Sequence, residues 1–292
     1  MSIPEVFVSV QPHTINLPFH GFNVPLTLSS PPDQSHTRPL VLVAPALGVP
    51  AIKYQQLLTT LGERGYQTAI YEMPGTGKST PHPRRGNDYG YSDLVFELIP
   101  EVLQALKSTL GHGPALMLGH SIGGQTMTLA ARAGLTGDAR VVSVAAGHLD
   151  CRSWRGPTRL AIMGAALAAH TSTRLLGYFP GRQMRFGGRE AATLMRDWGS
   201  GILRGRFAPE ARIPKQAALT HQPLHLCIKG DPFAPVGATR RLAALVQGEV
   251  REVAPTFPHG NPHLSWIKNP EPVVEIIEQW IEGVGAPDVI QA

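Results

Sequence analysis

The sequence predicts an α/β fold with a mostly parallel central sheet flanked by helices, and two observations support it. From residue 39 onward, short apolar runs alternate with segments whose apolar residues recur at helical spacing. This alternation is typical of right-handed βαβ units. The alternation stops near residue 150 and resumes near residue 223, so we expect an insertion between the sixth and seventh strands.

The predicted elements of the first half begin with two strands, residues 6–10 and 22–28, which we expect to pair antiparallel. Residues 39–46 form a continuous apolar run, which is typical of a central strand buried on both faces. Pro100 is expected to kink the longest of the following helices. The other elements predicted for the first half are helix 52–64, strand 67–73, helix 91–110, strand 115–119, helix 122–133 and strand 140–146.

The second half is divided by an arginine-rich, turn-rich stretch with two or three short helical patterns. We therefore predict a core made of residues 1–149 and 216–292, with residues 150–215 inserted as a lid. The core resumes with strand 223–229, helix 238–246, strand 250–253 and helix 272–281.

The composition indicates a globular protein that needs neither disulfides nor metal to fold. The chain has 292 residues, 42% of them hydrophobic and 16% charged, and a chain of this length buries about three-quarters of its unfolded surface. Its two cysteines, Cys151 and Cys227, lack metal-binding spacing. No secretory signal is visible, and the longest apolar run, residues 160–169, is shorter than the roughly 18 residues of a membrane span. We expect a cytoplasmic protein without a transmembrane segment, and its oligomeric state stays open.

The strongest chemical signal is the sequence GHSIGG at residues 119–124, between a predicted strand and a predicted helix. This is the G-x-S-x-G pattern of a nucleophile elbow in its required context. The turn is sharp, so the residues two before and two after Ser121 must have almost no side chain, which Gly119 and Gly123 satisfy. Ser121 then lies at a helix N-terminus, which favours developing negative charge.

A nucleophilic serine needs a histidine as base and an acid that orients it. In folds that carry this elbow, the acid and the histidine follow the serine in that order. His263, beside Leu264 and Trp266, which could anchor its loop, is the predicted base, and His259 is the alternative. Asp231 follows a predicted strand and is the predicted acid, with Asp150 as the alternative.

An oxyanion hole needs two backbone N–H groups. The first is expected from Ile122, directly after the serine. The second is expected from the turn after residues 39–46, where Leu47 is favoured, Ala46 is next, and Pro45 has no N–H to donate.

The sequence EMPGTGKS at residues 72–79 partly matches a phosphate-binding P-loop. The first glycine of that motif is replaced by Glu72, and Pro81 and Pro83 disfavour the helix that would follow. We therefore exclude nucleotide binding at this segment.

These motifs together resemble the α/β-hydrolase superfamily from about residue 39 to the end. GHSIGG resembles its elbow, EMPGTGKS its D-x-[RP]-G-x-G-x-S turn with Glu72 in place of aspartate, GDPFAP its acid loop, and PHLSW its histidine loop. APALGVPAIKY, GYFPGR and the Asp197-Trp198 pair resemble a little-characterised group of bacterial predicted hydrolases, often named after serine aminopeptidases or lysophospholipases.

The resemblance and the motifs imply a serine hydrolase that cleaves an ester, thioester or amide through an acyl-enzyme, without cofactor or metal. An acyltransferase with the same residues and a non-catalytic binding protein of the same fold are the alternatives. We expect a small-molecule substrate and no nucleic acid.

The net charge of +5 is unevenly distributed. Residues 150–215 hold 12 Arg and Lys against 4 Asp and Glu, a local net charge of +8, which leaves −3 for the rest. These arginines form either a solvated outer face or a site where Arg174, Arg182 or Arg185 attracts an anionic substrate group. Residues 160–169 are predicted as either buried helix or the lining of an apolar acyl pocket.

Overall fold

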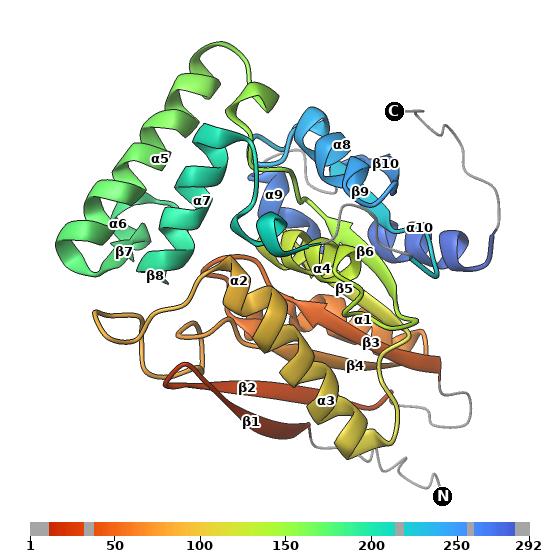
Figure 1. Cartoon of the computed structure of the whole chain (residues 1–292). Coiled ribbons are helices and arrows are strands. Elements are labelled where there is room, and N and C mark those ends of the chain that lie inside the picture. The colour runs from red at the N-terminus through yellow and green to blue at the C-terminus, as the bar shows by residue number, and fades with distance from the viewer. Residues whose placement is uncertain (1–11, 32–37, 214–218, 256–259, 284–292) are drawn as a thin grey trace, which may run out of the picture.

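The computed structural model describes residues 12–31, 38–213, 219–255 and 260–283. An eight-stranded sheet lies at its centre, in the order β1-β2-β4-β3-β5-β6-β9-β10 (Figure 1). The pairs β1–β2 and β2–β4 are antiparallel and all the others are parallel, which confirms the predicted fold class. The strands of this sheet are β1 His13–Phe19, β2 Phe22–Ser29, β3 Arg38–Ala44, β4 Tyr66–Tyr71, β5 Leu116–His120, β6 Arg140–Val144, β9 Leu224–Ile228 and β10 Glu249–Val253.

The N-terminal hairpin differs from the sequence prediction. The predicted strand 22–28 is confirmed as β2, but its antiparallel partner is β1, and the segment 6–10 lies outside the described residues. His20 and Gly21 join the two strands, with φ angles of 48° and 78°, because a tight two-residue hairpin turn of this kind requires left-handed backbone. Asn16 and Pro18 interrupt the β-forming pattern of β1, which therefore escaped the sequence analysis.

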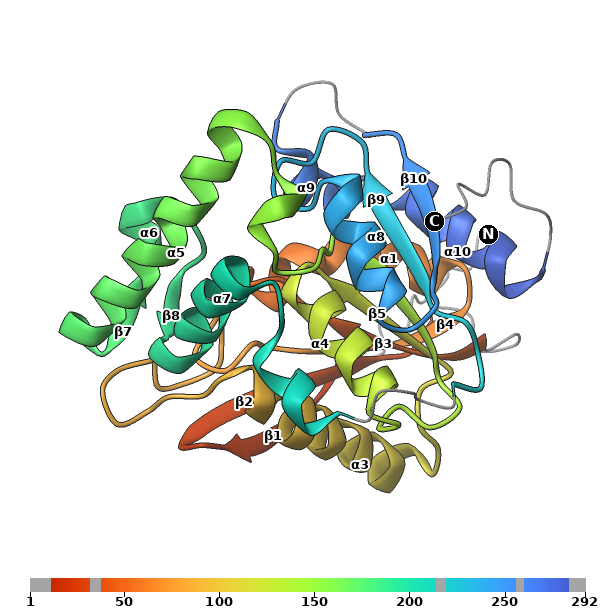
Figure 2. The same ribbon diagram turned by 45° about the horizontal axis from the view of Figure 1, so that its top comes forward.

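Helices cover both faces of the sheet (Figure 2). One face packs against α3, α4 and α8 in one hydrophobic cluster, and the opposite face packs against α1 and α10 in a second cluster. The bounds of these helices are α1 Gln55–Glu63, α3 Ile99–Leu110, α4 Ile122–Arg132, α8 Val236–Ala244 and α10 Glu271–Ile281.

The helix predicted over residues 91–110 is divided. It starts as α2, Tyr91–Asp93, continues through a π-helical turn, Leu94–Leu98, and only then becomes α3. Pro100 lies in the first turn of α3, where a missing N–H costs no hydrogen bond. The irregular turn therefore directly precedes the proline that we expected to kink the helix.

The chain between β6 and β9 forms a group of elements beside the sheet (Figures 1 and 2). Its helix α5, Gly156–Leu176, packs against α7, Ala192–Arg204, and is much longer than the short helical patterns that we expected. The apolar residues of α5 differ in burial, since Ala166 and Ala169 are buried while Leu160 is 72% exposed. Between α5 and α7 lie β7 Tyr178–Pro180, α6 Gly181–Met184 and β8 Arg189–Ala191.

No helix within the described ranges is both long enough and apolar enough to cross a bilayer.

The turn between β5 and α4 leaves no room for side chains beside Ser121. Ser121 has a φ of 53°, a left-handed conformation that is unusual for a residue with a side chain. A Cβ added to Gly119 would lie 2.4 Å from the Gly124 nitrogen, and one added to Gly123 would lie 2.3 Å from the Ala44 oxygen. Both contacts involve backbone atoms, so neither can be relieved by rotating a side chain.

We predict opposite effects of alanine at two helical glycines. Gly123→Ala should lower the free energy of unfolding by about 3 kcal/mol or more, because the added methyl overlaps backbone. Gly164→Ala, on α5, should raise it by about 0.5–1 kcal/mol, because the site is open and alanine favours helix. Urea denaturation measures both. Equal stability of Gly123→Ala and the wild type would contradict the close packing of the turn.

Candidate active site

The site lies where the strand order reverses direction. After β3, the chain places β4 on one side of β3 and β5 on the other. The loops that leave the carboxyl ends of β3 and β5 therefore border the same crevice, which is where open α/β sheets bind ligands. These two loops carry Leu47 and Ser121.

Ser121, His263 and Asp231 are hydrogen-bonded in series. The Ser121 hydroxyl donates to His263 Nε2 at 3.0 Å, and His263 Nδ1–H donates to Asp231 Oδ2 at 2.7 Å. Ser121 follows β5, Asp231 follows β9, and His263 lies in the short helix α9, Pro262–Ser265, after β10. The structure thus brings together the three side chains that the sequence singled out. Their separation along the chain is bridged by the neighbouring ends of the strands.

Backbone amides fix the orientation of the Asp231 carboxylate. Its Oδ1 accepts N–H groups of Phe233 at 2.8 Å and Ala234 at 3.2 Å, which leaves Oδ2 for His263. The side chain is fully buried, so the hydrogen bonds replace water as partners of its oxygens. The Asn261 side chain in turn accepts the His263 N–H at 3.1 Å and fixes the start of α9.

The alternative acid and base are placed differently. Asp150 accepts hydrogen bonds from Arg152 and Arg241 and makes none to His263. The hydrogen bond from Arg152 lowers the pKa of the Asp150 carboxyl. His259 lies outside the described residues.

A buried chain of hydrogen bonds connects three loops of the site. The Ala46 N–H donates to the Tyr54 hydroxyl at 2.7 Å, and that hydroxyl donates to His120 Nδ1 at 2.8 Å. His120 Nε2–H then donates to the His263 carbonyl at 2.8 Å. Burial lowers the pKa of His120 well below its usual value, so the ring is neutral, with one donor and one acceptor. His120, the residue directly before the serine, thereby fixes the backbone of the histidine loop.

These hydrogen bonds distinguish the two candidate amides after β3, those of Ala46 and Leu47. The Ala46 N–H is already bonded to Tyr54. Among the described residues, the N–H groups of Leu47 and Ile122 have no protein acceptor, and both residues border the cavity at Ser121. These two amides are therefore available to a ligand.

The two residues expected to anchor the histidine loop behave differently. Trp266 is 1% exposed and packs edge-on against His120, with 5.1 Å between ring centroids. Leu264 is 38% exposed and faces the cavity instead of the core.

Glu72 organises the turn that partly matches a P-loop. Its carboxylate accepts N–H groups of Ala51 at 2.9 Å and Lys78 at 3.1 Å. The Lys78 amide that a phosphate would need is thus occupied by the protein. Through its hydrogen bond with the Ala51 N–H, Glu72 connects this turn to the segment that follows Leu47.

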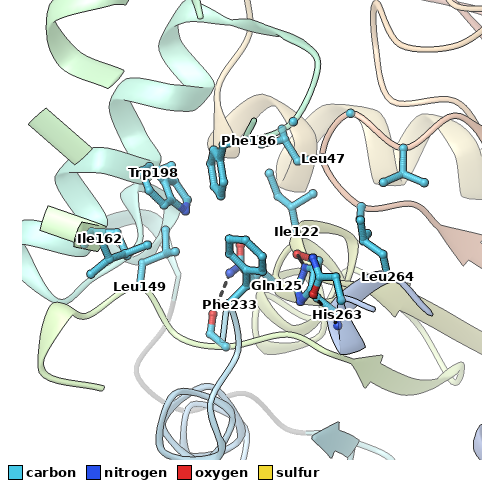
Figure 3. A pocket seen from close by; sticks show the side chains of 18 of the residues that line it. Leu47, Ile122, Gln125, Leu149, Ile162, Phe186, Trp198, Phe233, His263 and Leu264 are labelled. Carbon is cyan, nitrogen blue, oxygen red and sulfur yellow. Dashed lines mark hydrogen bonds between the residues drawn. The ribbon is translucent and has the colours of Figure 1, made fainter. Parts of the chain in front are cut away.

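A mainly apolar cavity of about 290 Å³ opens at Ser121. In Figure 3, Trp198, Ile162 and Leu149 lie at one side of the cavity, and His263 and Leu264 lie at the other. Gln125 is a polar group in the cavity wall, and its amide accepts from the Tyr91 hydroxyl and donates to the Gly147 carbonyl.

The inserted segment supplies part of this wall. Ile162 comes from α5, Phe186 from the loop before β8, and Trp198 from α7. Of the three arginines considered as anion-binding residues, only Arg185 borders the cavity. The sequence analysis missed Phe186 and Gln125, because no spacing pattern distinguishes them from ordinary loop and helix residues.

Glu190 joins the inserted segment to the turn at Leu47. Its side chain is fully buried, one carboxyl oxygen accepts the Gly188 N–H, and the other has no partner among the described residues. A Cβ added to Gly48 would lie 2.3 Å from the Gly188 nitrogen and 2.8 Å from Glu190 Oε1. Burial raises the pKa of Glu190 to about 7.

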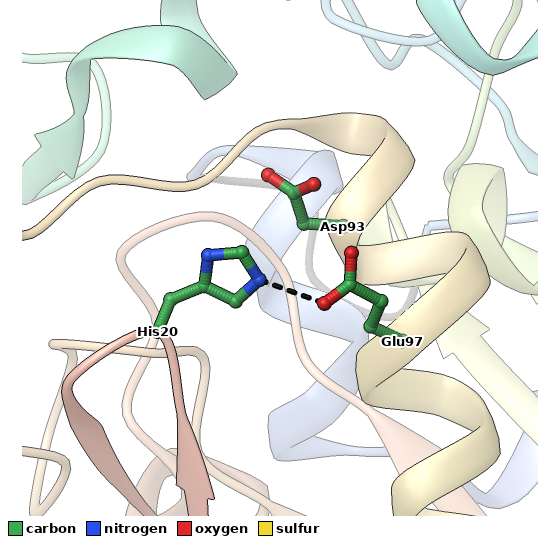
Figure 4. A group of neighbouring side chains, drawn as sticks. All are labelled: His20, Asp93 and Glu97. Atoms are coloured by element: carbon green, nitrogen blue, oxygen red, sulfur yellow. Dashed lines mark hydrogen bonds and ion pairs between the residues drawn. The ribbon is translucent and has the colours of Figure 1, made fainter.

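A surface cluster has side chains of metal-ligating type. Ligand atoms of His20, Asp93 and Glu97 lie within 4.8 Å of one another (Figure 4). His20 Nε2 contacts Glu97 at 2.9 Å, and Asp93 accepts the Gly90 N–H. The cluster is largely exposed and none of its members borders the Ser121 cavity. It therefore has no part in the chemistry of that site.

A model of the alpha/beta hydrolase family matches residues 40–276, and the chain belongs to that family. No curated protein sequence matches the chain.

Several solved structures share the fold. A monoglyceride lipase variant from Saccharomyces cerevisiae, solved with a substrate analog, has a TM-score of 0.65 and 15% identity, covering 98% of this chain and 100% of that one. A thermophilic esterase from Thermogutta terrifontis has a TM-score of 0.60 and 17% identity, covering 95% and 100%. A monoacylglycerol lipase from Paleococcus ferrophilus has a TM-score of 0.57 and 16% identity, covering 88% and 98%. At these identities the likeness establishes the fold alone.

The raised pKa of Glu190 predicts a specific pH dependence of stability. Between its ordinary value of 4.5 and about 7, the folded protein keeps this proton and the unfolded chain has lost it. Unfolding then releases a proton, so stability falls as pH rises through this window. Glutamine does not titrate, so Glu190→Gln should lose less stability than the wild type between pH 5 and pH 8.

The loss of unfolding free energy between pH 5 and pH 8 should be larger in the wild type than in Glu190→Gln by on the order of 3 kcal/mol. Urea unfolding of both proteins at both pH values measures this loss. Identical pH dependence in wild type and variant would show that Glu190 is not held protonated by burial.

Proposed function

We propose that this protein is a serine hydrolase that cleaves carboxylic esters with an apolar acyl group. The observation that carries the proposal is the hydrogen-bonded series Ser121–His263–Asp231. It opens into a mainly apolar cavity beside two amides that have no acceptor among the described residues. Each part of this arrangement matches a requirement of acyl transfer: a nucleophile, a base, an orienting acid and oxyanion donors.

In the first half of the reaction, Ser121 Oγ attacks the ester carbonyl while His263 Nε2 takes the hydroxyl proton. The carbonyl oxygen becomes an oxyanion, which accepts hydrogen bonds from the Leu47 and Ile122 amides. Asp231 holds His263 Nδ1–H and stabilises the imidazolium that forms. The tetrahedral intermediate then expels the alkoxide, which takes the proton from His263 and leaves as alcohol.

In the second half, water attacks the acyl group on Ser121. His263 removes a proton from the water, the same two amides hold the new oxyanion, and collapse of the intermediate breaks the bond to Ser121 Oγ. The proton on His263 returns to Ser121, and the carboxylic acid is released. An alcohol in place of water would give a transferase, and the two reactions differ only in this acceptor.

The cavity wall supports an apolar acyl group. Trp198, Ile162 and Leu149 offer aliphatic and aromatic surface, and burying apolar substrate surface there contributes about 25 cal/mol per Å². We assign residues 150–215 the role of a lid, since Ile162, Phe186 and Trp198 come from this segment. Arg185 is the one of the three considered arginines that borders the cavity, and we propose that it contacts any anionic group on the substrate.

The proposal predicts the effect of removing Ser121 or His263. With p-nitrophenyl butyrate as the substrate, Ser121→Ala and His263→Ala should each lower kcat by at least about 10³-fold. Ser172→Ala, a change of the same residue type on α5 away from the cavity wall, should keep wild-type activity. Adding a competing alcohol and analysing products separates hydrolysis from transfer. Unchanged hydrolysis in folded Ser121→Ala would refute the proposed role of Ser121.

A further inference from the structure

A second large hollow lies behind the wall of the Ser121 cavity. It has a volume of about 610 Å³ and is lined by the start of the inserted segment, by the loop after Asp231 and by the first turns of α8. Trp154 borders both this hollow and the Ser121 cavity, and its indole N–H donates to the Pro232 carbonyl at 2.8 Å. We call this hollow the arginine groove; its lining residues with polar side chains are Arg152, Ser153, Trp154, Arg155, Thr158, Arg240 and Arg241.

The arginine groove carries a strong positive charge. Four guanidinium groups line it, and the Asp150 carboxylate forms ion pairs with two of them, those of Arg152 and Arg241. Arg152 contacts Asp150 at 2.7 Å and Arg241 contacts it at 3.0 Å, so this carboxylate holds both side chains in place. Within the described part of the chain, Arg155 and Arg240 form no ion pair.

Two buried donors of the arginine groove have no acceptor among the described residues. They are Nε of Arg240 and the hydroxyl of Ser153. Buried polar atoms in folded proteins nearly always have a hydrogen-bond partner, and an unpaired one costs about 1–3 kcal/mol. Both belong to residues that line the same hollow, so the wall of the hollow has hydrogen-bonding capacity that the described residues do not use.

The N-terminus of α8 adds backbone donors to the same hollow. Its N-cap is Pro235, which offers no side-chain cap, and the N–H groups of Val236 and Gly237 have no acceptor in the described ranges. Gly237 lines the arginine groove. The start of a helix carries partial positive charge and binds anions through such free amides.

We propose that the arginine groove binds the phosphate groups of a phosphate ester or diphosphate. A phosphate presents several acceptor oxygens in a tetrahedral arrangement, and guanidinium groups bind it through paired hydrogen bonds. The guanidinium groups of Arg155 and Arg240 contribute the side-chain donors, and the first amides of α8 contribute the backbone donors. This inference does not depend on the hydrolase chemistry, since none of these donors is assigned a step in it.

The test measures phosphate binding directly. Inorganic pyrophosphate is titrated by calorimetry into the full chain with Ser121→Ala, which removes any hydrolytic turnover, in phosphate-free buffer of low ionic strength. The same titration is run with Arg155→Ala/Arg240→Ala and with Arg174→Ala/Arg182→Ala, each added to Ser121→Ala. The second pair removes the same charge from positions outside the arginine groove. A parallel arm uses vesicles of phosphatidylglycerol, with phosphatidylcholine vesicles as the uncharged control.

We expect pyrophosphate to bind, and Arg155→Ala/Arg240→Ala to weaken it at least about tenfold, with little change from Arg174→Ala/Arg182→Ala. Binding of phosphatidylglycerol vesicles alone, lost in Arg155→Ala/Arg240→Ala, would support the groove and identify a lipid headgroup as the phosphate source. No binding of either probe, or equal binding by both pairs of variants, would overturn the proposal. Urea unfolding of each variant checks that the protein is folded.

Discussion

The left-handed backbone at Ser121 is the constraint on which the rest of the site depends. It forces the chain to reverse between β5 and α4 in so little space that Gly119 and Gly123 cannot carry a Cβ. This close turn leaves the serine hydroxyl facing the crevice, and the next amide, that of Ile122, has no acceptor in the part of the chain that the structure describes. A residue in this conformation is held there by the packing around it, which is how folded proteins maintain strained functional turns.

His120 connects the serine turn to the other loops of the site by hydrogen bonds. Because burial keeps its ring neutral, one nitrogen accepts from Tyr54 and the other donates to the His263 carbonyl. The same Tyr54 hydroxyl holds the Ala46 N–H. The serine turn, the turn at Leu47 and the histidine loop are therefore positioned by one buried series of hydrogen bonds. Such networks stabilise a single arrangement, because breaking any member leaves a buried polar atom unpaired.

The sequence predicted the parallel core and the three polar residues of the site because both depend on local signals. Apolar runs identified β3 to β6, and a glycine-spaced turn with ordered acid and histidine identified Ser121, Asp231 and His263. Elements fixed by tertiary contacts were missed or misjudged. Pro18 obscured β1, whose stability comes from pairing with β2. The length of α5 could not be predicted, because its apolar residues are partly buried and partly exposed. Glu190 and the arginine groove depend on contacts between segments that are distant in the sequence.

Covalent labelling tests the central claim, that Ser121 is an activated nucleophile, most directly. The folded protein is treated with a fluorophosphonate, digested, and analysed by mass spectrometry to locate the modified residue. If Ser121 is activated by the fold, one phosphonylated peptide should appear, modified at Ser121, and no label should appear after heat denaturation. Absence of label on the folded protein, or label at another serine with Ser121 unmodified, would contradict it.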